Sequence, residues 1–214
     1  MRIIVEELTK SDIYIHILTS LKNVITGFVL AYVVALLLVL IMNEVKILDK
    51  IMYPIIELLR PIPNAGWVPI AILISTTIEQ SIIFITFIGA VFPIFLTLYR
   101  AIKTVPTQYE NLAQLNKLSK LERYIHIIMP AILPQLFTAA MLGISGGWLS
   151  VIMAEMISGK SGIGYFTWKN YTLLNYQLVI LGVIIMGCLG GLMSLIFSRL
   201  SKKISFWERR QDGK

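Results

Sequence analysis

Long uncharged, apolar stretches alternate with short polar segments along the chain. Residues 24–42, 81–99 and 178–198 each approach the roughly 20 residues that an α-helix needs to cross the hydrocarbon core of a bilayer. A fourth stretch, residues 131–154, begins directly after Pro130. None of the four contains Lys, Arg or Asp, each of which costs about 2.5 to 3.5 kcal/mol at the centre of a membrane helix. The pattern predicts four transmembrane helices.

A fifth apolar region, residues 51–78, differs from the others because Arg60, Pro61 and Pro63 interrupt it. We expect a short helix, a break and a second helical piece. Broken helices at membrane depth are stable only where protein or a water-filled cavity satisfies the freed backbone groups. We therefore take Pro61, Pro63 and Trp67 as candidates for the lining or gate of a path across the membrane.

A charged segment, residues 107–123, separates the uninterrupted stretches 81–99 and 131–154, and it predicts two short helices. Thr107 with Glu110 and Ser119 with Glu122 each form a Ser/Thr-x-x-Glu capping box, in which the hydroxyl and the carboxylate bond reciprocally to backbone N–H groups. We expect the turn between the two helices at Asn116 and Lys117, because Asn tolerates the left-handed conformation.

Composition confirms the membrane setting and narrows the class of protein. Apolar residues make up 57% of the 214 residues and charged residues only 14%, which excludes an ordinary soluble domain. The predicted fold is therefore all-α: one polytopic membrane domain over residues 1–214 with about five transmembrane helices. No soluble part remains to bind nucleic acid, so we assign the net charge of +7 to the membrane edges.

The Lys and Arg positions predict the orientation in the cell membrane. Six Lys or Arg residues follow the last predicted helix, and five more lie in residues 100–123. Both groups fall on one side of the membrane, which the positive-inside rule makes the cytoplasm. With five crossings, the N-terminus is then outside and the C-terminus cytoplasmic. The segment 107–123 is accordingly expected on the cytoplasmic face.

Candidate chemistry is sparse. Cys188 is the only cysteine, and His16 and His126 are isolated from other ligands, so no metal site is predicted. Residues 154–161 resemble a loose phosphate-binding loop, but a membrane helix precedes them where such a loop needs a β-strand. Within this stretch Glu155 and Ser161 are candidates for the path or its gate. The sequence is equally compatible with a second role for Glu155, as a membrane-edge residue bonded to nearby backbone N–H groups.

Four blocks in the same order resemble the permease subunit of binding-protein-dependent ABC importers, of the nitrate/sulfonate/taurine type. The blocks are residues 60–73, 88–95, 127–134 and 148–165. The resemblance implies a type I ABC importer permease core with a cytoplasmic coupling helix, transporting nitrate, sulfonate, taurine-like or other small organic solutes. The chain itself would then be no enzyme and hold no cofactor.

The resemblance also implies partners. They are a pair of ATPase subunits that bind ATP, an extracytoplasmic solute-binding protein, a second permease subunit in a homodimer or heterodimer, and the lipid bilayer. The family's docking motif, Glu-Ala-Ala-x3-Gly-x9-Ile-x-Leu-Pro, matches here only at Ala113, Ile127 and Pro130, with Lys117 in the Gly place. The docking residues implied are Glu110, Asn111, Leu112, Ala113, Leu115, Asn116 and Lys117.

Two other classes stay open from the residues alone. A secondary transporter needs no ATPase, but its sequence is expected to show paired repeats and ionisable residues inside the membrane. A membrane-embedded enzyme is expected to place polar catalytic groups within its helices. The apolar stretches of this chain contain mainly Gly, Ser and Thr as polar residues, which favours neither class.

Overall fold

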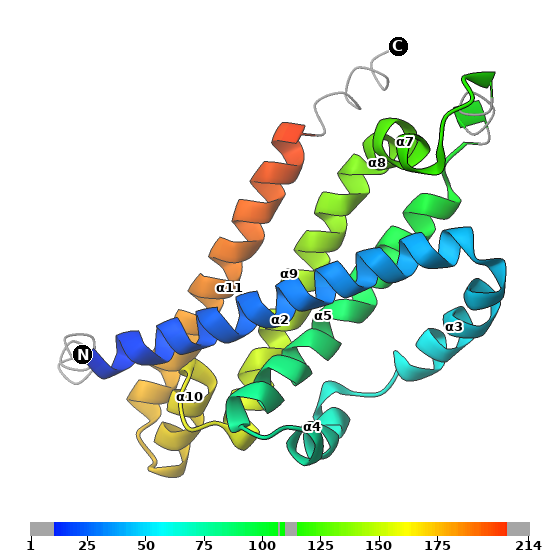
Figure 1. Cartoon of the computed structure of the whole chain (residues 1–214). Coiled ribbons are helices and arrows are strands. Elements are labelled where there is room, and N and C mark those ends of the chain that lie inside the picture. Colours follow the sequence, from blue (N-terminus) through cyan, green and yellow to red (C-terminus); the bar gives the residue numbers. More distant parts are fainter. Residues whose placement is uncertain (1–10, 107, 110–114, 205–214) are drawn as a thin grey trace.

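The computed structural model describes residues 11–106, 108–109 and 115–204, and this part of the chain consists of helices and connecting turns (Figure 1). For residues 11, 158 and 201–204 it describes the backbone alone. The predicted all-α class is therefore confirmed. Four helices are long and apolar enough to cross a membrane. They are α2 (Ser11–Glu44), α5 (Ile78–Lys103), α9 (Leu133–Ser158) and α11 (Tyr176–Ile204).

The first long helix, α2, begins well before residue 24, where the uncharged stretch starts. Its early turns carry Asp12, Lys22 and other polar residues, which made this part look like a preceding segment. Ser20 and Asn23 are nevertheless buried, because both bond to a carboxylate of α9. Tertiary partners thus extend the helix beyond the apolar pattern.

The interrupted region 51–78 forms two separate short helices and not one continuous helix. Helix α3 (Lys46–Leu59) ends at a turn, a 3-10 helix covers Asn64–Trp67, and α4 (Val68–Ile74) follows. At 1.5 Å per residue, the 14 residues of α3 span about 21 Å, less than the bilayer core. Together the pieces run beside α5, with α3 near its C-terminal part and α4 near its start (Figure 1).

The core of the fold is the contact of α5 with α9 and α2. Glycine permits the closest approach: a Cβ on Gly146 of α9 would overlap the carbonyl oxygen of Gly89 on α5. A Cβ on Gly89 would likewise overlap the Ser150 side chain. Small residues at such positions let membrane helices pack backbone to backbone. This close contact fixes α5 and α9 as a rigid pair.

One helix had no counterpart in the sequence prediction. Helix α10 (Ile163–Thr172) lies in the stretch read as a loop between the last two membrane helices, and it packs on α9 and α11. Its buried side chains include Ile163 and Phe166. Ten residues give too short an apolar pattern to distinguish such a helix from a loop.

The two ends of the molecule carry different elements (Figure 1). At one end, beside the C-terminal end of α11, lie α7 (Lys120–Arg123), a π-helix over Tyr124–Ile128, and α8 (Met129–Ala131). At the other end lie α4 and α10. Residues 115–123 and the loop 159–162 therefore belong to opposite ends.

Candidate functional site

The polar segment at residues 107–123, called the coupling segment below, contains a left-handed turn at Lys117. This residue has φ of 50°, a conformation that costs a non-glycine residue roughly 1–2 kcal/mol. Lys117 occupies the place of the Gly in the family motif, so its backbone adopts the conformation that glycine would favour. The turn was expected from Asn116; the structure places the left-handed residue one position later.

Ser119 and Glu122 form the predicted second capping box. The Ser119 hydroxyl accepts from the Glu122 N–H at 3.3 Å, and the Glu122 carboxylate accepts from the Ser119 N–H at 2.8 Å. The hydrogen bonds from the Ser119 side chain and backbone lower the pKa of Glu122 below its usual value. The first predicted box, Thr107 with Glu110, lies outside the described residues, as do the candidate docking residues Asn111, Leu112 and Ala113.

Two other candidate docking residues are described, and both are exposed. Leu115 is helical and 79% exposed, and Asn116 follows it in the turn before Lys117. A large apolar side chain in full contact with water favours burial against another surface. Leu115 is thus available to a partner at the end of the molecule that carries the coupling segment.

The coupling segment is tied to the end of α2 by ion pairs around Glu44. The Glu44 carboxylate pairs with Arg123 and, at 3.2 Å, with Lys120, and it accepts a hydrogen bond from the Tyr124 hydroxyl at 2.8 Å. Asn43 also donates to the Tyr124 hydroxyl, at 2.9 Å. We call these five residues the Glu44 cluster. It joins residues 120–124, which follow the Lys117 turn, to the last turn of α2.

A π-helix leads from the Glu44 cluster into α9. The Met129 N–H bonds to the Tyr124 carbonyl, five residues back. Pro130 follows and has no N–H with which to continue an α-helical ladder. A π-helix is uncommon, and its wider turn re-aims the side chains that it carries. Here it directs Tyr124 toward Glu44 while the chain continues through α8 into the membrane.

A second contact joins α3 to the same end of α5. The Lys103 ammonium lies 2.9 Å from an Asp49 carboxylate oxygen, and the Tyr53 and Tyr99 rings stack with centroids 4.7 Å apart. Helices α3 and α5 therefore run antiparallel. The first half of the interrupted crossing is held to α5 near the coupling segment.

The interruption itself is held to α9. Pro61 and Pro63 are exposed in the turn after α3, and Pro63 immediately precedes the 3-10 helix. Asn64, the first residue of that helix, donates from its amide to the Ser150 hydroxyl at 2.7 Å. Trp67 is half-buried, and its indole N–H is buried and has no partner among the described residues.

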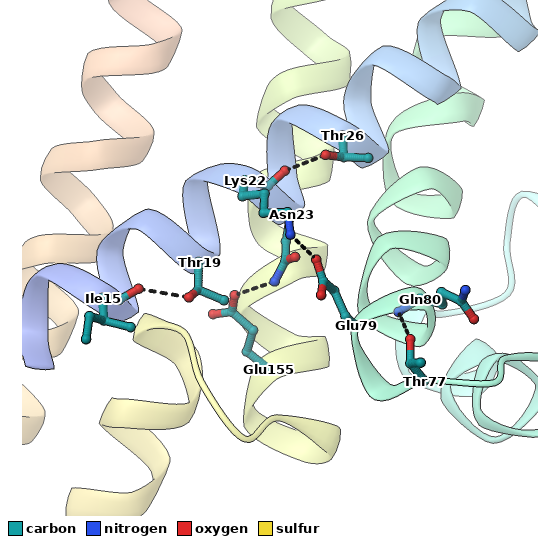
Figure 2. Close-up of polar contacts among 9 residues, drawn as sticks. All are labelled: Ile15, Thr19, Lys22, Asn23, Thr26, Thr77, Glu79, Gln80 and Glu155. Atoms are coloured by element: carbon teal, nitrogen blue, oxygen red, sulfur yellow. Dashed lines mark hydrogen bonds and ion pairs between the residues drawn. The ribbon is translucent and has the colours of Figure 1, made fainter.

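Glu155 is fully buried at the end of the molecule that carries α10. Its carboxylate accepts from the Ser20 hydroxyl at 2.8 Å and from the Gly164 N–H at 3.0 Å. It also accepts from the side-chain amide of Asn23 at 3.4 Å (Figure 2). The Ser20 hydroxyl in turn accepts from the Ile163 N–H at 2.8 Å. One of the three donors, the Gly164 N–H, is a backbone group near Glu155 in the chain, whereas Ser20 and Asn23 are side chains of α2.

The loop over Glu155 is shaped by glycine. Gly162 has φ of 110°, and a Cβ there would overlap the Glu155 carboxylate. Its N–H bonds to His16 Nδ1 at 3.0 Å, which adds a second tie to α2. Ser161 is half-buried in this loop. At the same end, Lys22 of α2 and Glu79 of α5 form an ion pair of 2.6 Å (Figure 2).

Sequence reasoning missed a groove that runs along α5. Its volume is about 430 Å³, and two arginines, Arg60 and Arg100, line it together with Gln135 of α9. Arg60 had been read only as a helix interrupter and Arg100 only as a topology signal. No pattern in the sequence brings them together, because Arg60 follows the end of α3 whereas Arg100 lies on α5.

Residues 27–206 match the family model described as the binding-protein-dependent transport system inner membrane component. The chain belongs to this family of ABC importer permeases. The permease is the membrane-spanning subunit of an importer whose ATPase is a separate subunit, so the alternatives of a secondary transporter and a membrane-embedded enzyme are not favoured. Members of the family generally work with an ATPase and a solute-binding protein.

Several curated relatives resemble the permease over most of its length. The nitrate import permease protein NrtB of Synechocystis is 34% identical over 196 residues, covering 92% of this chain and 71% of the relative. The bicarbonate transport system permease protein CmpB of Synechocystis is 33% identical over 189 residues, covering 88% and 68%. The putative aliphatic sulfonates transport permease protein SsuC of Escherichia coli is 28% identical over 159 residues, covering 74% and 60%.

Solved structures show the same fold. The MetNI methionine ABC transporter in an inward-facing conformation aligns with a TM-score of 0.71 at 18% identity, covering 90% of the permease and 94% of that chain. An amino acid ABC transporter with histidines aligns with a TM-score of 0.64 at 15% identity, covering 91% and 92%. At such identities the likeness concerns the fold of the permease alone.

Proposed function

We propose that this permease imports small anions and is driven by a cytoplasmic ATPase pair that docks on the coupling segment. The observation that carries the proposal is the Glu44 cluster, which ties the exposed end of the coupling segment to α2 by ion pairs and hydrogen bonds. A displacement of the segment is then transmitted to a membrane helix as a rigid-body motion. ATP is bound by the partner, and this chain holds no cofactor of its own.

The proposed docking surface consists of the residues that the family motif implies. Among those that the structure describes, Leu115 is the apolar side chain that would contact the ATPase. Leu115 precedes the left-handed Lys117 turn, and the capping box at Ser119 begins the next helix. Defined helix ends keep the segment rigid, which suits the transmission of force. The residues proposed for docking remain Glu110, Asn111, Leu112, Ala113, Leu115, Asn116 and Lys117.

The complete importer requires a second permease subunit, identical or related, because five crossings cannot enclose a path by themselves. The coupling segment and the C-terminus lie at the cytoplasmic face, and the N-terminus lies outside. The solute-binding protein then docks at the end that carries α4 and α10. Pro61, Pro63 and Trp67 belong to the interrupted crossing beside the path, whereas Glu155 and Ser161 shape its outer loop.

The relatives support an anionic solute. The three named above are a nitrate permease, a bicarbonate permease and a putative aliphatic sulfonates permease, and all three solutes are anions at neutral pH. An anionic solute also suits the arginine-lined groove along α5. Uptake of labelled nitrate, bicarbonate and taurine by vesicles that contain the complete importer distinguishes among these solutes.

The docking proposal is tested by Leu115→Ala in membranes that also contain the ATPase. We expect loss of ATPase from the permease during purification and a matching loss of uptake. Leu58→Ala is the matched control, because Leu58 is 77% exposed, close to the 79% of Leu115, and lies on α3. Unchanged ATPase retention and uptake in Leu115→Ala contradicts docking at this residue.

A further inference from the structure

The groove along α5 combines apolar side chains with several polar ones, including two arginines. Pro93, Thr97, Arg100 and Thr104 follow one another at helical spacings of three or four residues, so they share one face of the helix. The opposite wall comes from α9, and Arg60 reaches the groove from the end of α3. The complete lining is Arg60, Pro93, Leu96, Thr97, Arg100, Ala101, Thr104, Gln135 and Leu142.

Neither arginine of the groove has an acidic partner. Across residues 11–106, 108–109 and 115–204, no hydrogen bond or ion pair reaches the guanidinium of Arg60 or Arg100. The nearby acid Asp49 is paired with Lys103. Glu57 lies one turn before Arg60 but forms no ion pair in this part of the chain. Arginine stays charged in proteins, so two positive charges line the groove, and no acid among the described residues forms an ion pair with either.

A third polar group faces the same space. The Oε1 atom of Gln135 is buried and has no hydrogen-bond partner in the described part of the chain. A buried amide oxygen without a donor is costly, roughly 1–3 kcal/mol. Rotation of the amide exchanges its oxygen for its NH2 group, which donates. An anion between the arginines and Gln135 would satisfy that donor.

The groove continues toward the coupling segment. A second cavity of about 220 Å³ shares Ala101, Thr104 and Gln135 with it and extends to Pro106 and Tyr109. Arg60 lies beside Pro93, well within α5, whereas Tyr109 lies beyond the end of that helix. The two cavities together form a polar track from membrane depth to the start of the coupling segment.

We propose that Arg60 and Arg100 form a binding station for a small soluble oxyanion or carboxylate within the permease itself. The inference rests on the proposed function, because it places the station on the import path. Guanidinium groups bind planar oxyanions by paired N–H donors, which makes them suited to this class of ligand. The permease then selects solutes by charge, in addition to the selection made by the binding protein. Gln135 orients the bound anion.

Charge-selective thiol labelling tests the station without knowledge of the solute. In a Cys188→Ser background, Thr97→Cys places the single thiol on the groove wall. The complete importer, in phosphatidylcholine nanodiscs, is labelled with anionic sulfonatoethyl and cationic trimethylammonioethyl methanethiosulfonate. Each rate is divided by the rate with free 2-mercaptoethanol. Two positive charges within several ångströms are expected to favour the anionic reagent at least about fivefold.

Two variants and one control position make the result specific. Arg100→Gln is expected to lower the preference several-fold, and Arg100→Lys to retain it, because lysine keeps the charge. Thr76→Cys, exposed in the loop before α5 at the other end, is expected to show no preference. Millimolar sodium nitrate, compared with sodium gluconate, is expected to slow the anionic reagent at Thr97→Cys.

Three outcomes overturn the proposal. Equal normalised rates for the two reagents show that the groove has no anion preference. Unreactive Thr97→Cys shows that the groove faces lipid. Protection by added phosphatidylglycerol without protection by nitrate shows that the site takes a lipid headgroup. Failure of the proposed function itself appears separately, as unchanged ATPase retention and uptake in Leu115→Ala.

Discussion

The hydroxyl of Tyr124 donates to the carboxylate of Glu44 over 2.8 Å, across a separation of 80 residues in the chain. Glu44 ends α2, and Tyr124 begins the π-helix that leads into α9. The same carboxylate pairs with Arg123 and Lys120 of α7. One acid therefore joins two membrane helices to the coupling segment, at the place where force from an ATPase would enter.

Glu44→Gln is expected to uncouple the importer while leaving the ATPase bound. Loss of the charge leaves Arg123 without its carboxylate, and charge-assisted hydrogen bonds of this kind contribute about 1.5–3 kcal/mol. We expect solute transported per ATP hydrolysed to fall several-fold in reconstituted vesicles. Glu57→Gln is the matched control, since Glu57 forms no ion pair in the described part of the chain. An unchanged transport ratio in Glu44→Gln contradicts a coupling role.

Lys117→Gly is expected to stabilise the coupling segment. Glycine adopts positive φ without the roughly 1–2 kcal/mol that a side chain costs, although it loses more backbone entropy on folding. Hydrogen exchange of a peptide covering residues 115–123 is expected to slow. Lys117→Val, with a β-branched side chain at φ of 50°, is expected to speed it. Slower exchange in Lys117→Val than in Lys117→Gly contradicts the left-handed conformation of residue 117.

The capping box predicts an acid-sensitive start of α7. Hydrogen bonds from Ser119 lower the pKa of Glu122, so the folded box favours the ionised carboxylate. Its contribution is fully present above the unfolded pKa of about 4.3 and is lost as pH falls through the lower folded value. Hydrogen exchange at residues 119–123, corrected for intrinsic rates, is expected to accelerate below pH 4.5. Glu122→Gln should abolish this pH dependence, and its persistence assigns the effect to another group.

Gly162→Ala is expected to open the loop between α9 and α10. The alanine is strained at φ of 110°, and its Cβ overlaps the Glu155 carboxylate. We expect faster proteolysis between α9 and α10 and a lower unfolding temperature of the purified importer. Glu155→Gln should act in the same direction, because it removes an acceptor from Ser20 or Gly164 at about 1–3 kcal/mol. Gly187→Ala is the control, since a Cβ there meets no atom within 4 Å.

Some of these features could be read from local sequence. The capping box needs only Ser119 and Glu122, three residues apart, and a helix brings such neighbours together whatever surrounds them. The break near Pro61 follows from proline chemistry in the same way. The turn lies at Asn116 and Lys117, as predicted, but its left-handed residue is Lys117 and not Asn116, because backbone conformation at a helix end depends on contacts as well as residue type.

The buried carboxylate illustrates what local patterns lack. From the sequence, Glu155 had two open roles, one in the path or its gate and one as a membrane-edge residue bonded to nearby backbone N–H groups. Its partner Ser20 lies 135 residues earlier, in a stretch that the hydropathy pattern had left outside the first helix. No spacing rule relates the two residues, since only the packing of α2 against α9 brings them together.

By itself, the sequence determined the all-helical membrane fold, the interrupted crossing and the cap at Ser119, because apolar length, proline and short-range hydrogen bonds act within a few residues. Tertiary structure alone decided the Glu44 cluster, the Glu155 cluster of Ser20, Asn23 and Gly164, the short helix α10, and the meeting of Arg60 with Arg100. Each of these depends on helices distant in the chain lying side by side, and burial and charge pairing take effect only once those helices pack.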